Sequence, residues 1–278
     1  MPKHEPPQQP QRALPQGVRN IVAVAAGKGG VGKSTVSVNL AVALTAQGLR
    51  TGLLDADVYG PNLPQMMGVA NHVPRIGDDG KIEPASAHGV RLMSMGFLLD
   101  AEAPVIWRGP LLHGAMSQFL NDVRWGELDV LVVDLPPGTG DVQLSIGQLV
   151  PLTGAVIVTT PQNVALLDVM KAAAMLRKLE VPIFGVVENM GDFLCPHCGR
   201  SSRIFSHGAA QKFSRKYGAP LLGEIPLDPA ICAAGEDGTP LCLAQPKSAA
   251  ARALRAVAAA VAARLDVRLG TKNQKQGG

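Results

Sequence analysis

Continuously apolar runs alternate with helical stretches along most of the chain. Uninterrupted apolar runs, unlike runs that alternate with polar residues, are typical of parallel strands covered by helices on both faces. They occupy residues 20–25, 51–55, 129–134, 154–160, 182–188 and 220–225. The pattern predicts an α/β fold with a doubly wound, mainly parallel sheet.

The spacing of apolar residues predicts helices between these strands. We expect helices over residues 34–45, 165–179 and 247–265. In the second of these, Leu167, Met170, Ala174 and Arg177 follow helical spacing, which places them on one side of the helix. One apolar stripe in the last helix contains Leu254, Val257, Val261 and Leu265.

Three segments depart from this alternation. Residues 58–104 contain many Gly and Pro residues, and we expect them to leave the carboxyl edge of the sheet, where α/β proteins bind ligands. Residues 1–17 form a leader rich in Pro and Gln, and residues 270–278 form a polar tail. Such compositions cannot build a packed core, so we expect disorder at both ends and one domain over residues 18–269.

A phosphate-binding loop follows the first predicted strand. Residues 27–35, GKGGVGKST, match the pattern G-x-x-x-x-G-K-[ST], and the next helix begins there. Glycines let backbone N–H groups turn onto phosphate oxygens, the motif lysine contacts the β- and γ-phosphates, and the following hydroxyl ligates Mg²⁺. The motif predicts nucleotide contacts from Gly27, Lys28, Gly29, Gly30, Val31, Gly32, Lys33, Ser34 and Thr35, with Ser34 as the magnesium ligand.

Acidic residues end two other predicted strands. Asp134 closes LDVLVVD, where a P-loop protein places the carboxylate that holds Mg²⁺ through water, and Gly138 lies in the loop that would approach the γ-phosphate. Asp55 and Asp57 follow the strand TGLLD, and one of them could orient the attacking water. The alternative is that these two are loop carboxylates or a helix cap.

Composition excludes several classes of protein. The chain has 278 residues, of which 46% are hydrophobic and 4% aromatic, so Val, Leu, Ile and Ala must build its core. The net charge is +4, but the Lys and Arg residues look scattered, which favours a solvated surface over nucleic-acid binding. We find no secretory signal and no apolar run of the ~18 residues that a membrane span needs, so we expect a cytoplasmic protein.

Cys195 and Cys198 form a C-x-x-C pair, which supplies half of a four-ligand metal site. Two copies of the pair in a homodimer would give four thiolates for one shared [4Fe–4S] cluster, although the spacing also suits [2Fe–2S]. The competing interpretation is zinc held with His207 and His197. A redox dithiol is disfavoured because the pair does not open a helix directly after a strand. We expect Cys232 and Cys242 to be structural or inert.

Six segments together closely resemble the Mrp/ApbC family of iron–sulfur carrier ATPases. That family belongs to the deviant P-loop group that includes MinD, ParA and the nitrogenase iron protein. The resemblance covers about residues 19–245 and rests on KGGVGKST, DADVYGP, DLPPGTGD, TTPQNVALLD, ENM-x-x-F-x-CPHCG and GEIPLDP.

The resemblance implies a deviant Walker A fold and a role for each matching residue. Lys28 would reach across a homodimer interface to the partner's phosphates, Asp57 would position or activate water, and Asp55 would lie near the metal. Asp134 would be the Walker B carboxylate, and Asn189 would contact adenine. It also implies ATP and Mg²⁺ as cofactors, a shared cluster, and apoproteins and a cluster donor as partners.

Three functional hypotheses follow. The first is a slow, dimer-dependent ATPase that carries a cluster to apoproteins. The second is a positioning ATPase of the MinD/ParA type with a structural zinc knuckle, which would bind a membrane or DNA. The predicted last helix offers no aromatic anchor for a membrane, and that function leaves the cysteine pair unexplained. The third, a reductase partner like the nitrogenase iron protein, is disfavoured because we expect its cluster cysteines to be widely separated.

Overall fold

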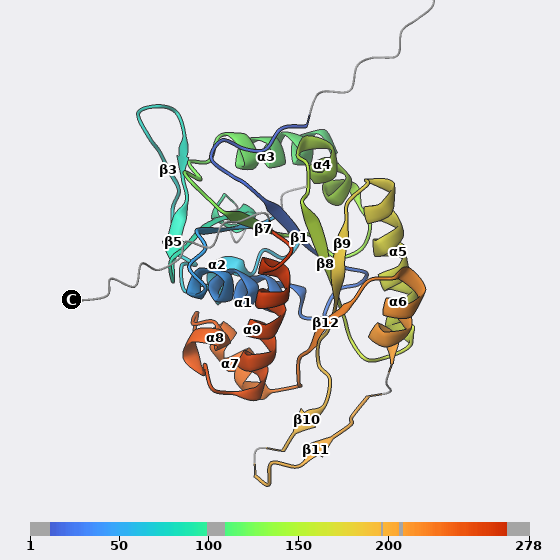
Figure 1. Ribbon diagram of the computed structural model, residues 1–278. Coiled ribbons are helices and arrows are strands. Elements are labelled where there is room, and N and C mark those ends of the chain that lie inside the picture. Colours follow the sequence, from blue (N-terminus) through green and yellow to red (C-terminus); the bar gives the residue numbers. More distant parts are fainter. Residues whose placement is uncertain (1–11, 99–108, 196, 206–207, 266–278) are drawn as a thin grey trace, which may run out of the picture.

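The computed structural model describes residues 12–98, 109–195, 197–205 and 208–265. In these residues the main sheet has eight strands in the order β12-β9-β8-β1-β7-β2-β6-β5, parallel except at the edge strand β5 (Figure 1). They span β1 Ile21–Ala26, β2 Thr51–Asp55, β5 Ala85–Ala87, β6 Val90–Ser94, β7 Val130–Asp134, β8 Gly154–Thr159, β9 Ile183–Glu188 and β12 Leu221–Glu224. Two separate hairpins pair β3 Arg75–Ile76 with β4 Ile82–Glu83, and β10 Phe193–Leu194 with β11 Ser201–Ser202.

Helices cover both faces of this sheet. One face carries α1 Lys33–Ala46, α2 Leu63–Met66, α7 Pro229–Glu236, α8 Leu241–Ala244 and α9 Ala249–Ala262. The other carries α3 Gly109–Asn121, α4 Asp141–Leu149, α5 Val164–Lys178 and α6 Ala209–Tyr217. A short 3₁₀ helix covers Met95–Phe97. A hydrophobic core lies on each face of the sheet, and the strands contribute side chains to both. In β1, Val22 and Val24 pack in one core, and Ile21 and Ala23 pack in the other. The predicted doubly wound α/β fold is confirmed.

Two details of the helices and strands differ from the expectation. The stripe expected on α5 faces solvent, with Leu167 66% exposed, because a different set of residues forms the buried side of this helix: Ala165, Val169, Ala172, Ala173, Met175 and Leu176. Of the expected excursion 58–104, residues 99–104 lie outside the described residues, and part of the rest returns to the sheet, since β6 pairs with β2 in parallel. Arg91 interrupts the apolar run of β6, but its guanidinium donates to the main-chain carbonyl of Trp125. The stripe expected on the last helix is confirmed as buried, although α9 ends at Ala262 and Leu265 lies beyond it.

The ends of the chain fall largely outside the described residues. Residues 1–11 of the expected leader and the whole expected tail, 270–278, are not described. In the described part of the leader, Pro15 is buried and Gly17 accepts a hydrogen bond from Leu128 N at 2.8 Å. No helix in the described residues is long and apolar enough to cross a membrane.

Candidate functional site

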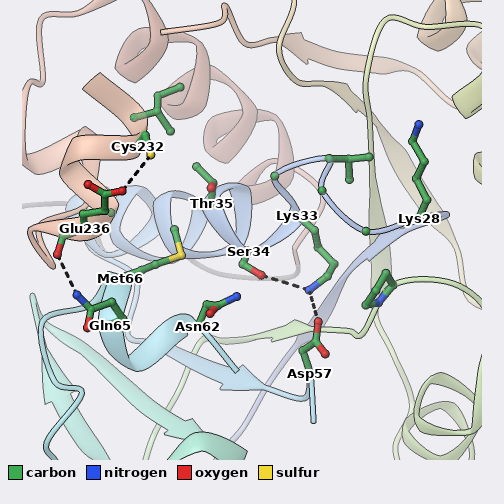
Figure 2. Close-up of a pocket in the computed structure, with 17 residues that line it drawn as sticks. Lys28, Lys33, Ser34, Thr35, Asp57, Asn62, Gln65, Met66, Cys232 and Glu236 are labelled. Atoms are coloured by element: carbon green, nitrogen blue, oxygen red, sulfur yellow. Dashed lines mark hydrogen bonds and ion pairs between the residues drawn. The ribbon is translucent and has the colours of Figure 1, made fainter. Parts of the chain in front are cut away.

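The loop of residues 27–32 joins the carboxyl end of β1 to α1, whose N-terminus faces it (Figure 2). Gly32 caps α1 with a left-handed φ of 79°, and a Cβ there would collide with the Asn189 amide. Residue 32 must therefore be glycine for two reasons: the backbone conformation disfavours other residues, and there is no room for a side chain. The free N–H groups of a helix N-terminus bind anions, so the local geometry suits a phosphate.

Lys33 lies in a cluster of oxygen atoms beneath this loop. Its side chain is only 6% exposed, and Nζ lies 2.7 Å from Asp134 Oδ2 and 3.7 Å from Asp57 Oδ2. Ser34 Oγ donates to the same Asp134 oxygen at 2.7 Å, and Ser37 Oγ donates to Asp134 Oδ1 at 2.5 Å. The structure thus brings together four residues that were predicted for the site, from α1, from the end of β7 and from the turn after β2, and adds Ser37.

The donor set suits a hard cation. Mg²⁺ prefers oxygen ligands and is held in proteins by one or two side chains together with water and substrate phosphates. Ser34 and Asp134 provide a hydroxyl and a carboxylate that already lie within hydrogen-bonding distance of each other. These are the two residues that would hold magnesium next to a bound phosphate chain.

Asp55 is fully buried at the end of β2. It accepts hydrogen bonds from Ser94 Oγ at 2.9 Å and from the main-chain N–H groups of Asp57 and Leu63, each at 3.2 Å. Burial, and then the nearby Asp134 carboxylate, raise the pKa of Asp55 to about 7. The pKa of Asp57 is also raised by burial, although Lys33 opposes that shift. Asp55 therefore organises the turn that carries Asp57.

Lys28 differs from Lys33 in its surroundings. Its side chain is half-buried and points away from Lys33 and Asp57 in Figure 2. Among the residues that the structure describes, it makes no hydrogen bond or ion pair. An unpaired lysine ammonium at the mouth of a phosphate site is available to a group outside its own chain.

A cavity of ≈ 550 Å³ opens over the loop (Figure 2). One wall contains the P-loop and Asp57, and the opposite wall comes from the α2 region and α7. Gln65 Nε2 of α2 donates to the main-chain oxygen of Glu236 at 3.0 Å, which ties α2 to α7. The size suits a small organic ligand. The second wall was missed because no motif marks it; its lining residues are Asn62, Gln65, Met66, Ile231, Cys232, Gly235 and Glu236.

Asn189 and Gly138 do not line this cavity, but each is next to a residue that does: Asn189 bonds to Val31, and Gly138 follows Pro137. Asn189 is buried, and its Nδ2 donates to the main-chain oxygen of Val31 at 2.9 Å. Gly138 has a left-handed φ of 90°, and its carbonyl oxygen accepts a hydrogen bond from Gln143 Nε2 at 3.1 Å. Contacts of Asn189 with adenine, and of Gly138 with a γ-phosphate, stay predictions.

Cys195 and Cys198 lie at the end of the β10–β11 arm, which projects away from the sheet in Figure 1. Cys195 N donates to Arg200 O at 3.0 Å, and Gly199 N donates to Cys195 O at 2.8 Å, so the pair sits in a tight turn. Cys195 is half-buried and Cys198 exposed. Hydrogen bonds, led by that with the Arg200 main chain, lower the pKa of the Cys198 thiol.

Both ends of the arm are attached to the edge of the sheet beside the cavity. At the first end Asn189 bonds to the P-loop, Met190 has a left-handed φ of 58°, and Gly191 N donates to Ile225 O at 2.9 Å. Past the second end, Ala210 N donates to Glu188 Oε2 at 3.3 Å. The nucleotide loop and the cysteine arm therefore share the carboxyl end of β9.

The remaining candidates for metal binding are the zinc set with His207 and His197, and the two other cysteines. Within the described ranges, no three His, Cys, Asp or Glu side chains come together to hold a metal ion, and His207 lies outside those ranges. Cys242 is buried beneath α9, and burial raises its pKa to about 11, as expected for a structural thiol. Cys232 is instead exposed in the cavity wall, with Sγ 3.5 Å from Glu236 Oε1.

Residues 17–262 match the model of the ParA group described as "NUBPL iron-transfer P-loop NTPase". The chain belongs to this family. Among its relatives, the iron-sulfur cluster carrier protein of Deinococcus radiodurans is 54% identical over 93% of the chain and 73% of its own length. The iron-sulfur protein required for NADH dehydrogenase of Arabidopsis thaliana mitochondria is 49% identical over 87% of the chain and 77% of its length. The resemblance inferred from the motifs is confirmed.

Solved structures of similar proteins have the same fold as this chain. The Archaeoglobus fulgidus nucleotide-binding protein in complex with ADP is 40% identical, with a TM-score of 0.72 over 80% of this chain and 87% of that one. The cell division ATPase MinD of Pyrococcus furiosus is 26% identical, with a TM-score of 0.65 over 88% of this chain and 99% of that one. The predicted deviant Walker A fold is therefore confirmed.

Sequence reasoning missed two hydroxyl groups of this P-loop NTPase. Ser37 was detectable, because it lies one helical turn after Lys33 and so on the same side of α1. Ser94, which donates to Asp55, was not detectable, because it ends β6, the strand that the glycine-rich segment concealed.

Proposed function

We propose that the chain is an ATP-hydrolysing, magnesium-dependent carrier of an iron–sulfur cluster. The cluster is cargo, held by Cys195 and Cys198 from each of two copies and passed to apoproteins in the cytoplasm. The observation that supports this most is the attachment of the cysteine arm to the end of β9, where Asn189 also contacts the P-loop. The names of the relatives support the same cargo.

Each residue of the nucleotide site has a distinct role in ATP hydrolysis. Lys33 and the α1 N-terminus bind the β- and γ-phosphates, and Ser34 with Asp134 holds the metal, which neutralises charge on the phosphates. Asp57 positions the attacking water, and Asp55 holds the turn that carries Asp57. Lys28 stabilises charge on the transferred phosphoryl group of the partner copy, as an arginine finger does. Turnover is therefore slow in a single copy.

A shared cluster explains why one chain has only half a site. Two thiolates per copy give four ligands in a symmetric dimer. Nucleotide state changes how the two copies meet, and ATP must bind the two arrangements with different affinities for this coupling to act.

Metal analysis of the protein purified without oxygen tests this proposal. We expect iron and acid-labile sulfide in matching amounts per dimer, lost in Cys195→Ala and kept in Cys232→Ala, the matched control with an exposed thiol off the arm. ATP binding should survive the loss of iron. Stoichiometric zinc, or no metal after supply of iron and sulfide, would contradict the carrier. Such a result would favour a positioning ATPase, which liposome and DNA binding with ATP would then reveal.

A further inference from the structure

The net positive charge of the chain comes from one stretch. Residues 193–223 contain no Asp or Glu, and five basic residues: Arg200, Arg203, Lys212, Arg215 and Lys216. The rest of the chain, with 21 basic and 22 acidic residues, has a net charge of −1. The expectation of scattered charge is therefore wrong for this segment, which contains the cysteine pair.

The fold exposes all five basic residues, which we call the cationic surface. Arg200 and Arg203 belong to the β10–β11 arm. Lys212, Arg215 and Lys216 lie on one side of α6, the helix that follows the arm, because they are three and four residues apart. The opposite side of α6 buries Ala210 and Phe213 in the core. No basic run in the sequence marks this surface, because residues 204–211 separate Arg203 from Lys212.

Little of this charge is neutralised within the chain. Arg203 Nε lies 3.6 Å from Asp192 Oδ1, whereas Lys212 bonds to the neutral amide of Asn163. Arg200, Arg215 and Lys216 form no ion pair with any described residue. The adjoining elements contribute four acidic residues, each with a partner: Asp192 near Arg203, Asp168 paired with Lys171, Glu224 bonded to Gln211, and Glu188, which accepts from Ala210 N.

The arm also exposes apolar side chains beside its charges. Leu194 is 38% and Ile204 54% exposed, and both lie within nine residues of the cysteine pair. An apolar centre with a charged rim is the usual composition of a protein–protein interface. Exposed cations around a binding site also steer an acidic partner and raise its association rate.

We propose that the cationic surface docks an acidic protein that exchanges the cluster with Cys195 and Cys198. This inference rests on the proposed function and adds the chemistry of the partner. The exchange replaces each iron–thiolate bond to Cys195 or Cys198 by a bond to a partner cysteine. The proton of that partner thiol passes to the freed cysteine, and no electron is transferred.

Binding of an acidic apo-ferredoxin to the metal-free protein tests the docking surface without requiring a cluster. The test variant is Lys212→Gln/Arg215→Gln/Lys216→Gln. The matched control, Lys247→Gln/Arg252→Gln/Arg264→Gln, removes three exposed charges at and beyond the ends of α9, on the opposite face of the sheet. We expect the α6 variant to bind about tenfold more weakly at low salt, the control to change by less than about twofold, and wild-type affinity to fall with added salt.

Three results would overturn the inference: equal binding by the two triple variants, binding independent of salt, or equal binding of a ferredoxin whose surface carboxylates are replaced by amides. Tighter, α6-dependent binding of phosphatidylglycerol vesicles or duplex DNA would also overturn it. Circular dichroism verifies that each variant is folded, and ATP hydrolysis should be unchanged in both. The metal analysis is a separate experiment. Absence of iron would mean that the carrier function is wrong, whereas failure of docking with iron present would mean that the docking surface is wrong.

Discussion

The Lys33 ammonium lies 2.7 Å from Asp134 Oδ2, and the Asp134 side chain is fully buried. Lys33 is thus the counter-charge of the Asp134 carboxylate, whose other side-chain partners within the described ranges are the hydroxyl groups of Ser34 and Ser37. Removing one partner of a buried ion pair leaves an uncompensated charge, which costs more than an exposed pair contributes. The phosphate-binding lysine therefore stabilises the fold as well as the ligand.

Lys33→Ala should lower the free energy of unfolding by about 3 kcal/mol and abolish ATP binding. Urea denaturation measures the first effect, and calorimetric titration with a non-hydrolysable ATP analogue measures the second. Lys28→Ala is the control, because Lys28 makes no ion pair with a described residue, and its stability should stay within about 0.5 kcal/mol of wild type. Equal destabilisation by both substitutions would disprove the double role of Lys33.

Lys28→Ala should reduce ATP turnover by about 10³-fold while changing the Kd for ATP by less than about threefold. Its side chain points away from Lys33 and Asp57 in Figure 2, so its effect should depend on the second copy. Mixing the Lys28→Ala and Asp57→Ala variants tests this. In a heterodimer of the two, the Lys28→Ala copy keeps its own Asp57 and receives Lys28 from the other copy, so ATP hydrolysis should be partly restored. Normal hydrolysis by Lys28→Ala alone would show that no lysine acts across an interface.

Asn189→Ala should weaken ATP binding by about tenfold and reduce the preference for ATP over GTP. The amide is buried and donates to Val31 O at 2.9 Å, so its loss should also cost about 1 kcal/mol of stability. Competition titrations with the two nucleotides separate these effects. If ATP and GTP affinities fell equally, Asn189 would only support the P-loop backbone and would not contact the base.

The parts of the fold that the sequence predicted are those whose pattern is local. Strands β1, β2, β7, β8 and β9 are uninterrupted apolar runs, and each was placed to within about two residues. Strand β6 was missed because Arg91 breaks its run and finds a partner only in the folded chain, at the Trp125 carbonyl. The buried side of α5 was misjudged because Val169, Ala173 and Leu176, which the expected stripe left out, form that side, whereas Leu167 faces solvent.

In the candidate site, too, the residues in short motifs were predicted, and those that depend on the packing of distant segments were not. The P-loop and Asp134 are marked by short motifs, and the structure brings Lys33, Ser34 and Asp134 into contact. The cavity wall on α2 and α7 depends on how two distant segments pack, which no local spacing reveals. The cationic surface likewise requires knowing which side of α6 faces solvent.

The stability of the metal-free and nucleotide-free protein should fall as pH rises from about 5 to about 7. Asp55 has a folded pKa of about 7 against an ordinary value of 3.8, so in this window the unfolded carboxyl has lost its proton while the folded one retains it. The unfolded state then binds fewer protons, and the Asp55 contribution to the free energy of unfolding decreases by up to about 1.4 kcal/mol per pH unit, levelling off above the folded pKa.

Asp55→Asn isolates this effect, because an amide of the same shape does not titrate. Urea denaturation in EDTA at pH 5, 6, 7 and 8 should give wild type a steeper loss of stability than the variant up to pH 7, and equal slopes at higher pH. Parallel curves across the whole range would mean that Asp55 is ionised in the folded protein throughout. In that case the hydrogen bonds from Ser94, Asp57 and Leu63 would outweigh the burial of its charge.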